Sequence, residues 1–325
     1  MYCLEEKPDA VENESSSSFS LGSTTTEARQ HQSVVTPVQR DKLPPHLTPE
    51  HEDVYPMKRK PRGLAVIINN INFTPKKEYP SLSLDRREGS EVDVQKLEEL
   101  FQELYFTVKV HEDLTGQQLT DKVLSYSKED HSNYDAFVLC LMSHGQEDGI
   151  LGTDGMDVKI TNLRDMFTSS NCISLVGKPK LIIVQACRGL KKDKGSYEVK
   201  DGPVNSQIQQ PEDEKKEIWT LQFPAKETIA DAADFAIAYA CVSGFASFRN
   251  VKHGSRFIQN LYDVFCDCSG YEHLLDMLTK VNDKVNKMGG IDGKQIPQPL
   301  TTLTKKLYFW PHIYTVASPT TNSSD

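Results

Sequence analysis

The chain has 325 residues, of which 38% are hydrophobic and 26% are charged, which is ordinary for a protein that builds a sizeable core. Its formal net charge of −9 argues against a general nucleic-acid binder, whose affinity would depend on neutralising phosphates. The sequence shows neither an apolar leader nor an apolar run of about 18 residues, so we expect a cytoplasmic protein with reduced thiols. The one close cysteine pair, Cys266 and Cys268, has the spacing of neither a metal knuckle nor a redox motif, and we predict no metal and no cofactor.

Residues 1–60 are rich in serine, threonine and proline and contain few aromatic residues. Such a composition cannot repay the entropy lost on ordering. We therefore predict a disordered, prodomain-like tail, with the folded part beginning near Arg62.

Strand and helix signals alternate after this point. Leu64–Ile68 is a continuous apolar run, typical of a strand buried in a parallel sheet. A helix follows, with Ser90 as its N-cap, Asp93 three residues later and an apolar stripe through residue 104. The remaining signals are strands at 105–110, 136–142, 180–186, 235–241 and 306–311, a short helix at 121–127, and two helices with apolar stripes over 257–265 and 274–285. Residues 190–226 lack periodicity, so they predict an exposed linker. The alternation indicates an α/β protein with a mostly parallel sheet and helices on both faces.

Two of the predicted strands end in residues that carry chemistry. Gln185-Ala186-Cys187-Arg188-Gly189 follows one buried strand, and His144-Gly145 follows another, 43 residues before Cys187. A thiol with a pKa of about 8.5 is only a few per cent thiolate at neutral pH, so it needs a base such as His144. The backbone N–H groups of Gly145 and Cys187 are the natural donors for a tetrahedral oxyanion. This arrangement suits nucleophilic catalysis.

The motif around Cys187, with its upstream histidine, resembles the signature of the caspases, which are cysteine endopeptidases that cut after aspartate. The resemblance covers about residues 57–311. It includes the segments 61–63, 149–155, 247–250 and 305–309. It is strongest to the death-receptor initiator branch, the caspase-8 type, at the segments 55–58, 131–133, 233–235 and 295–299.

The resemblance implies a three-layer fold around a six-stranded sheet and a zymogen that acts in apoptotic or related cell-death signalling. Such a chain would be cut into a large subunit, residues 61–201, and a small subunit, residues 202–325, which pair and then dimerise. We expect the cut between subunits after Asp201 and release of the tail after Asp53. An upstream protease or adaptor would serve as activator, although the tail contains no recognisable death-effector or CARD module.

Family members hold the substrate aspartate with two arginines and a glutamine, which correspond to Arg87, Arg249 and Gln185. Guanidinium suits this task because its planar fork meets a carboxylate through two hydrogen bonds and keeps its charge. The resemblance adds three further substrate-binding residues, Ser247, Asn250 and Arg256. Arg256 next to Asn250 suggests an acidic preference at the fourth substrate residue upstream of the cut. Ala246, which stands where effector members usually have an aromatic residue, suggests a wide pocket for the second substrate residue.

Two other functions compete with this interpretation. The first is a catalytically inactive scaffold that regulates other caspases, but such proteins usually lose the cysteine, the histidine or the pocket arginines, and this chain keeps them all. The second is a relative that cuts after arginine or lysine, which would need acidic residues where Arg87 and Arg249 stand.

Overall fold

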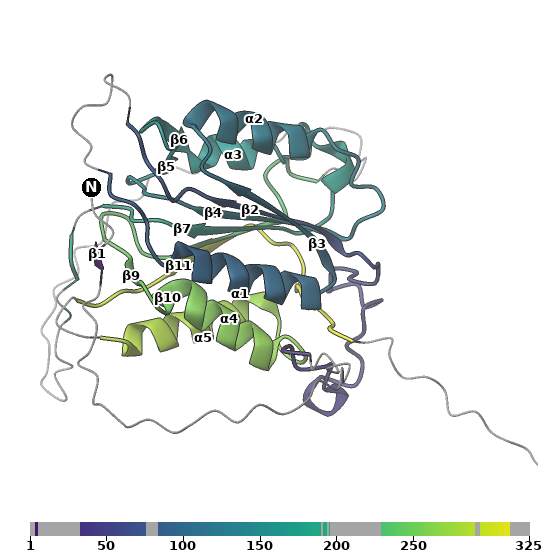
Figure 1. Cartoon of the computed structure of the whole chain (residues 1–325). Helices are drawn as coiled ribbons and strands as arrows, with labels where there is room; N and C mark the ends of the chain where they lie inside the picture. The colour runs from purple at the N-terminus through teal and green to yellow at the C-terminus, as the bar shows by residue number, and fades with distance from the viewer. Residues whose placement is uncertain are drawn as a thin grey trace, which may run out of the picture.

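A six-stranded sheet with the strand order β11-β8-β7-β4-β2-β3 forms the centre of the molecule (Figure 1). The computed structural model describes residues 4–5, 33–75, 84–189, 191–193, 195, 229–289 and 293–312. Five of the strands are parallel, and β11 joins one edge in the antiparallel direction. In chain order, the elements are β1 (Leu4–Glu5), η1 (Arg40–Lys42), β2 (Gly63–Asn69), α1 (Ser90–Glu103), β3 (Phe106–Glu112), α2 (Gly116–Ser127), β4 (Ala136–Met142), β5 (Gly149–Leu151), β6 (Asp157–Lys159), α3 (Ile160–Asp165), η2 (Ile173–Leu175), β7 (Lys180–Gln185), β8 (Phe235–Tyr239), β9 (Phe248–Asn250), β10 (Gly254–Ser255), α4 (Arg256–Cys268), α5 (Leu274–Lys287) and β11 (Gln298–Thr301).

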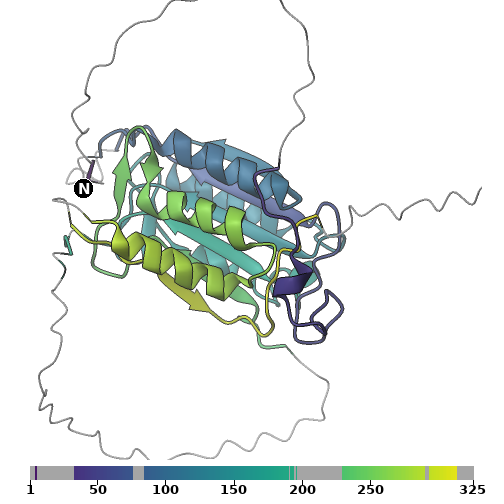
Figure 2. The ribbon, with the colours of Figure 1, turned by 90° about the horizontal axis from the view of Figure 1, so that it is seen from below.

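Helices cover both faces of this sheet. The helices α1, α4 and α5 lie side by side on one face, and α2 and α3 lie on the other (Figures 1 and 2). Side chains of β2 alternate between the two layers: Ala65 and Ile67 belong to the core under α1, α4 and α5, whereas Leu64, Val66 and Ile68 belong to the core under α2 and α3. Every residue of β2 is buried because neither face of the sheet meets water. The predicted three-layer α/β fold is confirmed.

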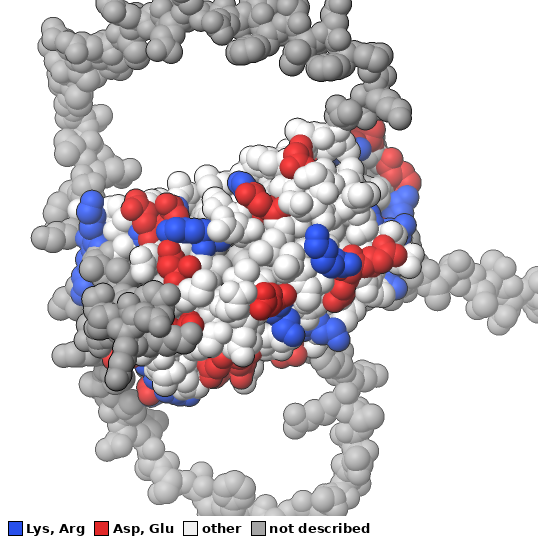
Figure 3. Space-filling model, turned by 90° about the horizontal axis from the view of Figure 1, so that it is seen from above, with Lys and Arg blue, Asp and Glu red and all other residues white. Residues whose placement is uncertain are grey.

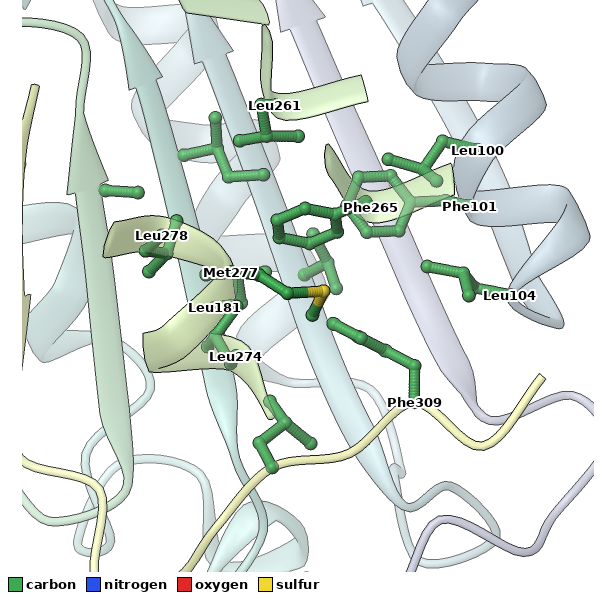
Figure 4. Close-up of a cluster of buried hydrophobic side chains, with 14 of the residues drawn as sticks. Leu100, Phe101, Leu104, Leu181, Leu261, Phe265, Leu274, Met277, Leu278 and Phe309 are labelled. Carbon is green, nitrogen blue, oxygen red and sulfur yellow. The ribbon is translucent and has the colours of Figure 1, made fainter. Parts of the chain in front are cut away.

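The larger of the two cores joins segments that are far apart in the chain. Phe101 of α1, Phe265 of α4 and Met277 of α5 meet over the sheet, together with Phe309 from the C-terminal segment (Figure 4). Each of these side chains is fully buried, and burial of one such side chain contributes about 1.5–3 kcal/mol. The chain before the predicted linker and the chain after it therefore share one hydrophobic core.

The predicted disorder of the tail up to residue 60 is wrong for residues 33–60. This segment runs along the end of the molecule, and the OH of Tyr55 donates a 2.7 Å hydrogen bond to Asp234. Its apolar residues are buried in the same core, namely Val35, Leu43, Leu47, Val54, Tyr55 and Met57. They are spaced irregularly because the segment packs mostly as a loop, and periodicity alone does not reveal such packing.

The sixth strand is not the one that the sequence predicts. Residues 306–311 form no strand, although Leu307, Tyr308, Phe309 and Trp310 are all buried beneath the helices. The edge strand is instead β11, where Pro299 pairs with Ala238 of β8. Proline is tolerated on an edge strand because one side of that strand needs no ladder hydrogen bonds, so proline concealed this strand in the sequence.

Helix starts also differ from the prediction. Helix α1 has Ser90 as its first residue and Gly89 as its N-cap, with φ of 78° in the left-handed region. Helix α2 begins at Gly116, five residues before the predicted start, because Thr115 and Gln118 form a capping box there.

Two small sheets lie outside the central one. In the first, β9 pairs in parallel with β1 and antiparallel with β10, and in the second β5 pairs with β6. On the described part of the face that carries α2 and α3, acidic and basic side chains are interspersed (Figure 3). Among the described helices, none combines the length and the apolar character needed to cross a bilayer.

Candidate active site

Strand register places His144 beside Cys187. In the β4–β7 pair, Met142 lies opposite Gln185, and each of the two site residues follows its strand by two positions. The N–H of Ser143 also donates to Gln185 C=O at 3.3 Å, so the alignment continues past the strand ends. Neighbouring strands are about 4.8 Å apart, so the carboxyl ends of β4 and β7 bring the two loops together.

Gly145 fits directly against the cysteine loop. A Cβ at this position would lie 2.5 Å from the carbonyl oxygen of Cys187 and 2.7 Å from Cβ of Ala186. Only glycine permits this approach. The absence of a side chain at Gly145 thus allows the histidine and cysteine loops to touch, besides giving room for a substrate carbonyl.

A backbone carbonyl orients the His144 ring. Its Nε2 lies 2.8 Å from the carbonyl oxygen of Asp85, and the ring of Phe73 packs against it with a centroid distance of 4.7 Å. A carbonyl oxygen can only accept, so Nε2 is the protonated nitrogen and Nδ1 is the basic one. Sequence reasoning missed Asp85 because a main-chain oxygen acts independently of the side-chain type.

The thiol of Cys187 is buried against Ser247, with 2% of the residue exposed. Its Sγ accepts from the Ser247 N–H at 3.4 Å and lies 3.7 Å from both the carbonyl oxygen and the Oγ of Ser247. Ala246 completes this small apolar contact. Within the described part of the chain, six cysteines are present as thiols.

Three predicted specificity residues, Arg87, Gln185 and Arg249, are buried, with exposures of 0%, 0% and 2%. Arg87 Nη1 donates to Asn69 Oδ1 at 3.0 Å and to Asn70 C=O at 2.7 Å. Arg249 Nε donates to the carbonyl oxygen of Glu88, the neighbour of Arg87, at 2.7 Å. Both guanidinium groups are therefore held by backbone or amide oxygens around the start of α1.

Ser247 connects these residues to the nucleophile. Gln185 Nε2 donates to Ser247 Oγ at 3.3 Å, and Ser247 Oγ also contacts Cys187 Sγ. Within the described part of the chain, Arg249 Nη1 and Gln185 Oε1 are buried without a hydrogen-bond partner. Buried polar atoms are nearly always satisfied, so these two atoms of predicted specificity residues are candidates for hydrogen bonds to a ligand.

Asn250 and Arg256, two further predicted substrate-binding residues, contact other parts of the chain in this structure. Asn250 Oδ1 accepts from the N–H groups of Lys252 and His253 and shapes the turn between β9 and β10. Strand register puts Gly254, not Arg256, opposite Asn250. Arg256 lies over the ring of Phe248 at 4.4 Å and donates to Gly293 C=O at 2.9 Å. The acidic preference at the fourth substrate residue stays a prediction.

The carboxyl group of Asp93 is close enough to Arg87 and Arg249 to interact with their charges. In the sequence, Asp93 is recognisable only as part of a helix start. Asp93 of α1 is fully buried, and its Oδ1 accepts the Ser255 N–H at 2.8 Å. Burial raises the pKa of Asp93 to about 6, although the Ser255 hydrogen bond and the charges of Arg87 and Arg249 lower it. The carboxyl group is therefore mainly ionised at neutral pH.

This raised pKa predicts how stability depends on pH. An acid with a higher pKa in the folded chain than in the unfolded chain binds its proton more tightly when the chain is folded. The contribution of Asp93 to the free energy of unfolding is therefore fully present below about pH 4 and is lost as the pH rises through about 6. Relative to Asp93→Asn, which does not titrate, the wild type should lose up to about 3 kcal/mol of unfolding free energy over this range. Urea denaturation of both proteins between pH 4 and pH 7 measures the difference. A difference that is constant with pH would contradict the assignment.

The two predicted cleavage sites differ in what the structure says of them. Asp201 lies outside the described residues. Asp53 is exposed, but its carbonyl oxygen accepts the Lys306 N–H at 2.8 Å, and the next residue, Val54, is buried. A protease needs an accessible, unpaired segment, so the structure disfavours a cut after Asp53 without local opening.

The ends of two adjacent parallel strands carry a thiol and an imidazole, and the predicted specificity residues include two buried arginines. This combination suits thiol chemistry on a substrate with an acidic group. Comparison with known families matches the caspase domain to residues 62–308. The chain is 38% identical to caspase-8 of Rattus norvegicus over 266 residues, which are 80% of this chain and 54% of the relative. It is 34% identical to caspase-2 of Gallus gallus, over 83% of this chain and 65% of that relative. It is 37% identical to caspase-3 of Bos taurus, over 79% of this chain and 88% of that relative. The chain belongs to the caspase family. It spans about half to two thirds of the length of the caspase-8 and caspase-2 relatives.

Proposed function

We propose that the chain is a cysteine endopeptidase that cleaves peptide bonds after aspartate, is made as a zymogen and acts in apoptotic or related cell-death signalling. The observation that carries the proposal is the contact of Ser247 with both Cys187 Sγ and Gln185, beside the buried guanidinium groups of Arg87 and Arg249. A bound aspartate would pair with these groups and bring the bond after it to the thiol.

In the proposed reaction, His144 Nδ1 removes the proton from Cys187, and the thiolate attacks the substrate carbonyl carbon. The N–H groups of Gly145 and Cys187 stabilise the oxyanion. The imidazolium then gives its proton to the leaving amine, and water releases the acyl group by the reverse sequence. The Asp85 carbonyl oxygen keeps the ring in the tautomer that this sequence requires.

Two contacts support a low-activity precursor. Cys187 is held against Ser247, so its sulfur must leave this contact before it can attack. The strand β1 pairs with β9, whose residues include Arg249. A substrate strand that adds to this edge of β9 would have to displace β1.

Dimerisation of large and small subunit pairs is part of the proposal. The strand β11 forms one edge of the central sheet, and its Leu300 is 47% exposed. An edge strand with an exposed apolar residue is suited to pairing with a second copy. We further propose a cytoplasmic location, because the cytosol keeps thiols reduced.

The test of this function is cleavage of matched peptides that differ only in the residue before the cut. We expect hydrolysis after aspartate, and rates for glutamate and asparagine that are lower by about 10³-fold or more, because each would leave the buried cations poorly paired. An absence of cleavage by the processed dimer would favour an inactive scaffold that regulates other caspases. Equal cleavage after aspartate and asparagine would contradict the specificity.

Processing of the linker gives a separate prediction. We expect the first cut between subunits at Asp201–Gly202, because Glu198 stands three positions before the aspartate and a small residue follows the cut. Asp201→Ala should slow conversion to two fragments, whereas Asp213→Ala should not, because Glu214 follows that aspartate. Mass spectrometry of the fragments identifies the cut. A fully processed and active enzyme with an intact Asp201–Gly202 bond would refute this site.

A further inference from the structure

Asp93 is shielded from solvent and lies close enough to Arg87 and Arg249 to interact with their charges. It stands in the first turn of α1 and is fully buried. Its Oδ1 accepts the Ser255 N–H at 2.8 Å, and within the described part of the chain Oδ2 has no hydrogen-bond partner. A carboxylate is rarely buried unless it acts on nearby charges, so its presence here needs a reason.

The Ser255 hydrogen bond ties Asp93 to β10, the strand that pairs with the one carrying Arg249. In the β9–β10 pair, Ser255 lies directly opposite Arg249. On the other side, Arg249 Nε donates to Glu88 C=O, and the carbonyl oxygen of Arg87 accepts from Ser90 Oγ at the start of α1. Asp93 thus joins the two segments that supply the pocket arginines, one before and one after the predicted linker.

Two glycines make this close fit possible. A Cβ on Gly254, which has φ of +85°, would lie 2.3 Å from Asp93 Oδ1. A Cβ on Gly89, which has φ of +78°, would lie 2.6 Å from the carbonyl oxygen of Val251. Both positions combine a left-handed backbone with a close contact, so the β9–β10 hairpin presses directly on the first turn of α1 (Figure 1).

The charges that act on Asp93 are the two pocket guanidinium groups. Arg87, in the loop before α1, and Arg249, in β9, each favour the ionised carboxylate. Two buried cations without a counter-ion would repel each other and would be costly to desolvate. One ionised carboxylate near them offsets half of this charge and leaves the other half for a ligand.

We propose that Asp93 is a positioning residue, whose carboxylate holds Arg87 and Arg249 in the arrangement that receives the substrate's aspartate. This proposal rests on the proposed function. Asp93 acts through the two arginines and does not contact the substrate, because it is fully buried and bonded to Ser255.

Two variants of Asp93 distinguish a positioning role of its carboxylate from a role that depends only on its negative charge. Asp93→Asn keeps an acceptor for the Ser255 N–H and removes the charge. Asp93→Glu keeps the charge and displaces the carboxylate by one methylene. If Asp93 only placed negative charge near the pocket, Asp93→Asn would bind acidic substrates more tightly and Asp93→Glu would resemble the wild type. A positioning role predicts weaker binding in both variants.

The experiment measures kcat and KM for peptides with aspartate or asparagine before the cut, using the wild type, both variants and a control. The control is Glu91→Gln, which removes a carboxylate from the same helical turn, but one that is 40% exposed and paired with Arg86. For the aspartate peptide, we expect KM to rise about 10-fold or more in Asp93→Asn, with kcat within about 3-fold of the wild type, and a smaller rise in Asp93→Glu. The preference for aspartate over asparagine should fall with the rise in KM, and Glu91→Gln should behave as the wild type.

The folded fraction of each variant is measured by near-UV circular dichroism and by iodoacetamide titration of Cys187. An unchanged or lower KM in folded Asp93→Asn would overturn the proposal. If Asp93→Asn does not fold, a wild-type KM in Asp93→Glu would overturn it equally. Failure of the wild type to cleave the aspartate peptide would count against the proposed function itself, so the two failures are distinguishable.

Discussion

Replacement of Cys187 by alanine should lower kcat/KM for aspartate peptides by at least about 10³-fold. Without the sulfur there is no covalent intermediate, and the oxyanion donors and the pocket can provide only a small residual rate. Folding should change little, because the thiol is a small group and alanine keeps the Cβ of the side chain. Single-turnover assays with freshly processed protein measure the loss.

The matched control is Cys172→Ala. Cys172 is also a buried free thiol, but it belongs to the core under α2 and α3 and contacts Ser174. This variant should keep activity within about 3-fold of the wild type. Activity that persists in Cys187→Ala, or is lost equally in Cys172→Ala, would end the assignment of the nucleophile.

Replacement of Arg249 by glutamine should cost about 2–5 kcal/mol in transition-state binding of an aspartate substrate, equivalent to a loss of kcat/KM of about 30-fold to several thousand-fold. The reason is that Arg249 Nη1 is a buried donor with no acceptor among the described residues, so a substrate carboxylate is its expected partner. Cleavage after asparagine, which brings no charge, should fall much less. The preference for aspartate should therefore shrink.

Arg86→Gln serves as the control for this second prediction. Arg86 adjoins Arg87 in the chain, but its side chain is 52% exposed and pairs with Glu88 and Glu91. Exposed ion pairs contribute about 0–1 kcal/mol, so activity and specificity should be nearly unchanged. A wild-type preference in Arg249→Gln would show that aspartate is recognised elsewhere.

The elements of the central fold that rest on hydrophobic pattern were predictable. The parallel strands β2, β4 and β7 are uninterrupted apolar runs, and their ends located His144 and Cys187 correctly at one edge of the sheet. The edge strand β11 was not predictable from pattern, since it contains Pro299 and is half exposed. The packing of residues 33–60 was also not predictable, because the buried residues of this loop follow no regular spacing.

The site was predictable where side-chain type carries the chemistry. Arg87, Gln185 and Arg249 come from three separate parts of the chain, and the structure brings all three together. The Asp85 carbonyl oxygen could not be predicted, because every residue has one. Asp93 was visible in the sequence only as an acidic residue near a helix start, a position where the helix dipole alone gives a sufficient reason for it.

Reaction with a peptide chloromethyl ketone whose last residue is aspartate tests the central claim most directly, because the thiolate displaces chloride to form a stable thioether, which reports the nucleophile and the specificity together. The measurement is intact mass followed by peptide mapping, with a matched asparagine probe in parallel. We predict one adduct per active chain, on Cys187, formed at least about 10²-fold faster with the aspartate probe. Labelling of another cysteine, or equal rates with the two probes, would contradict it.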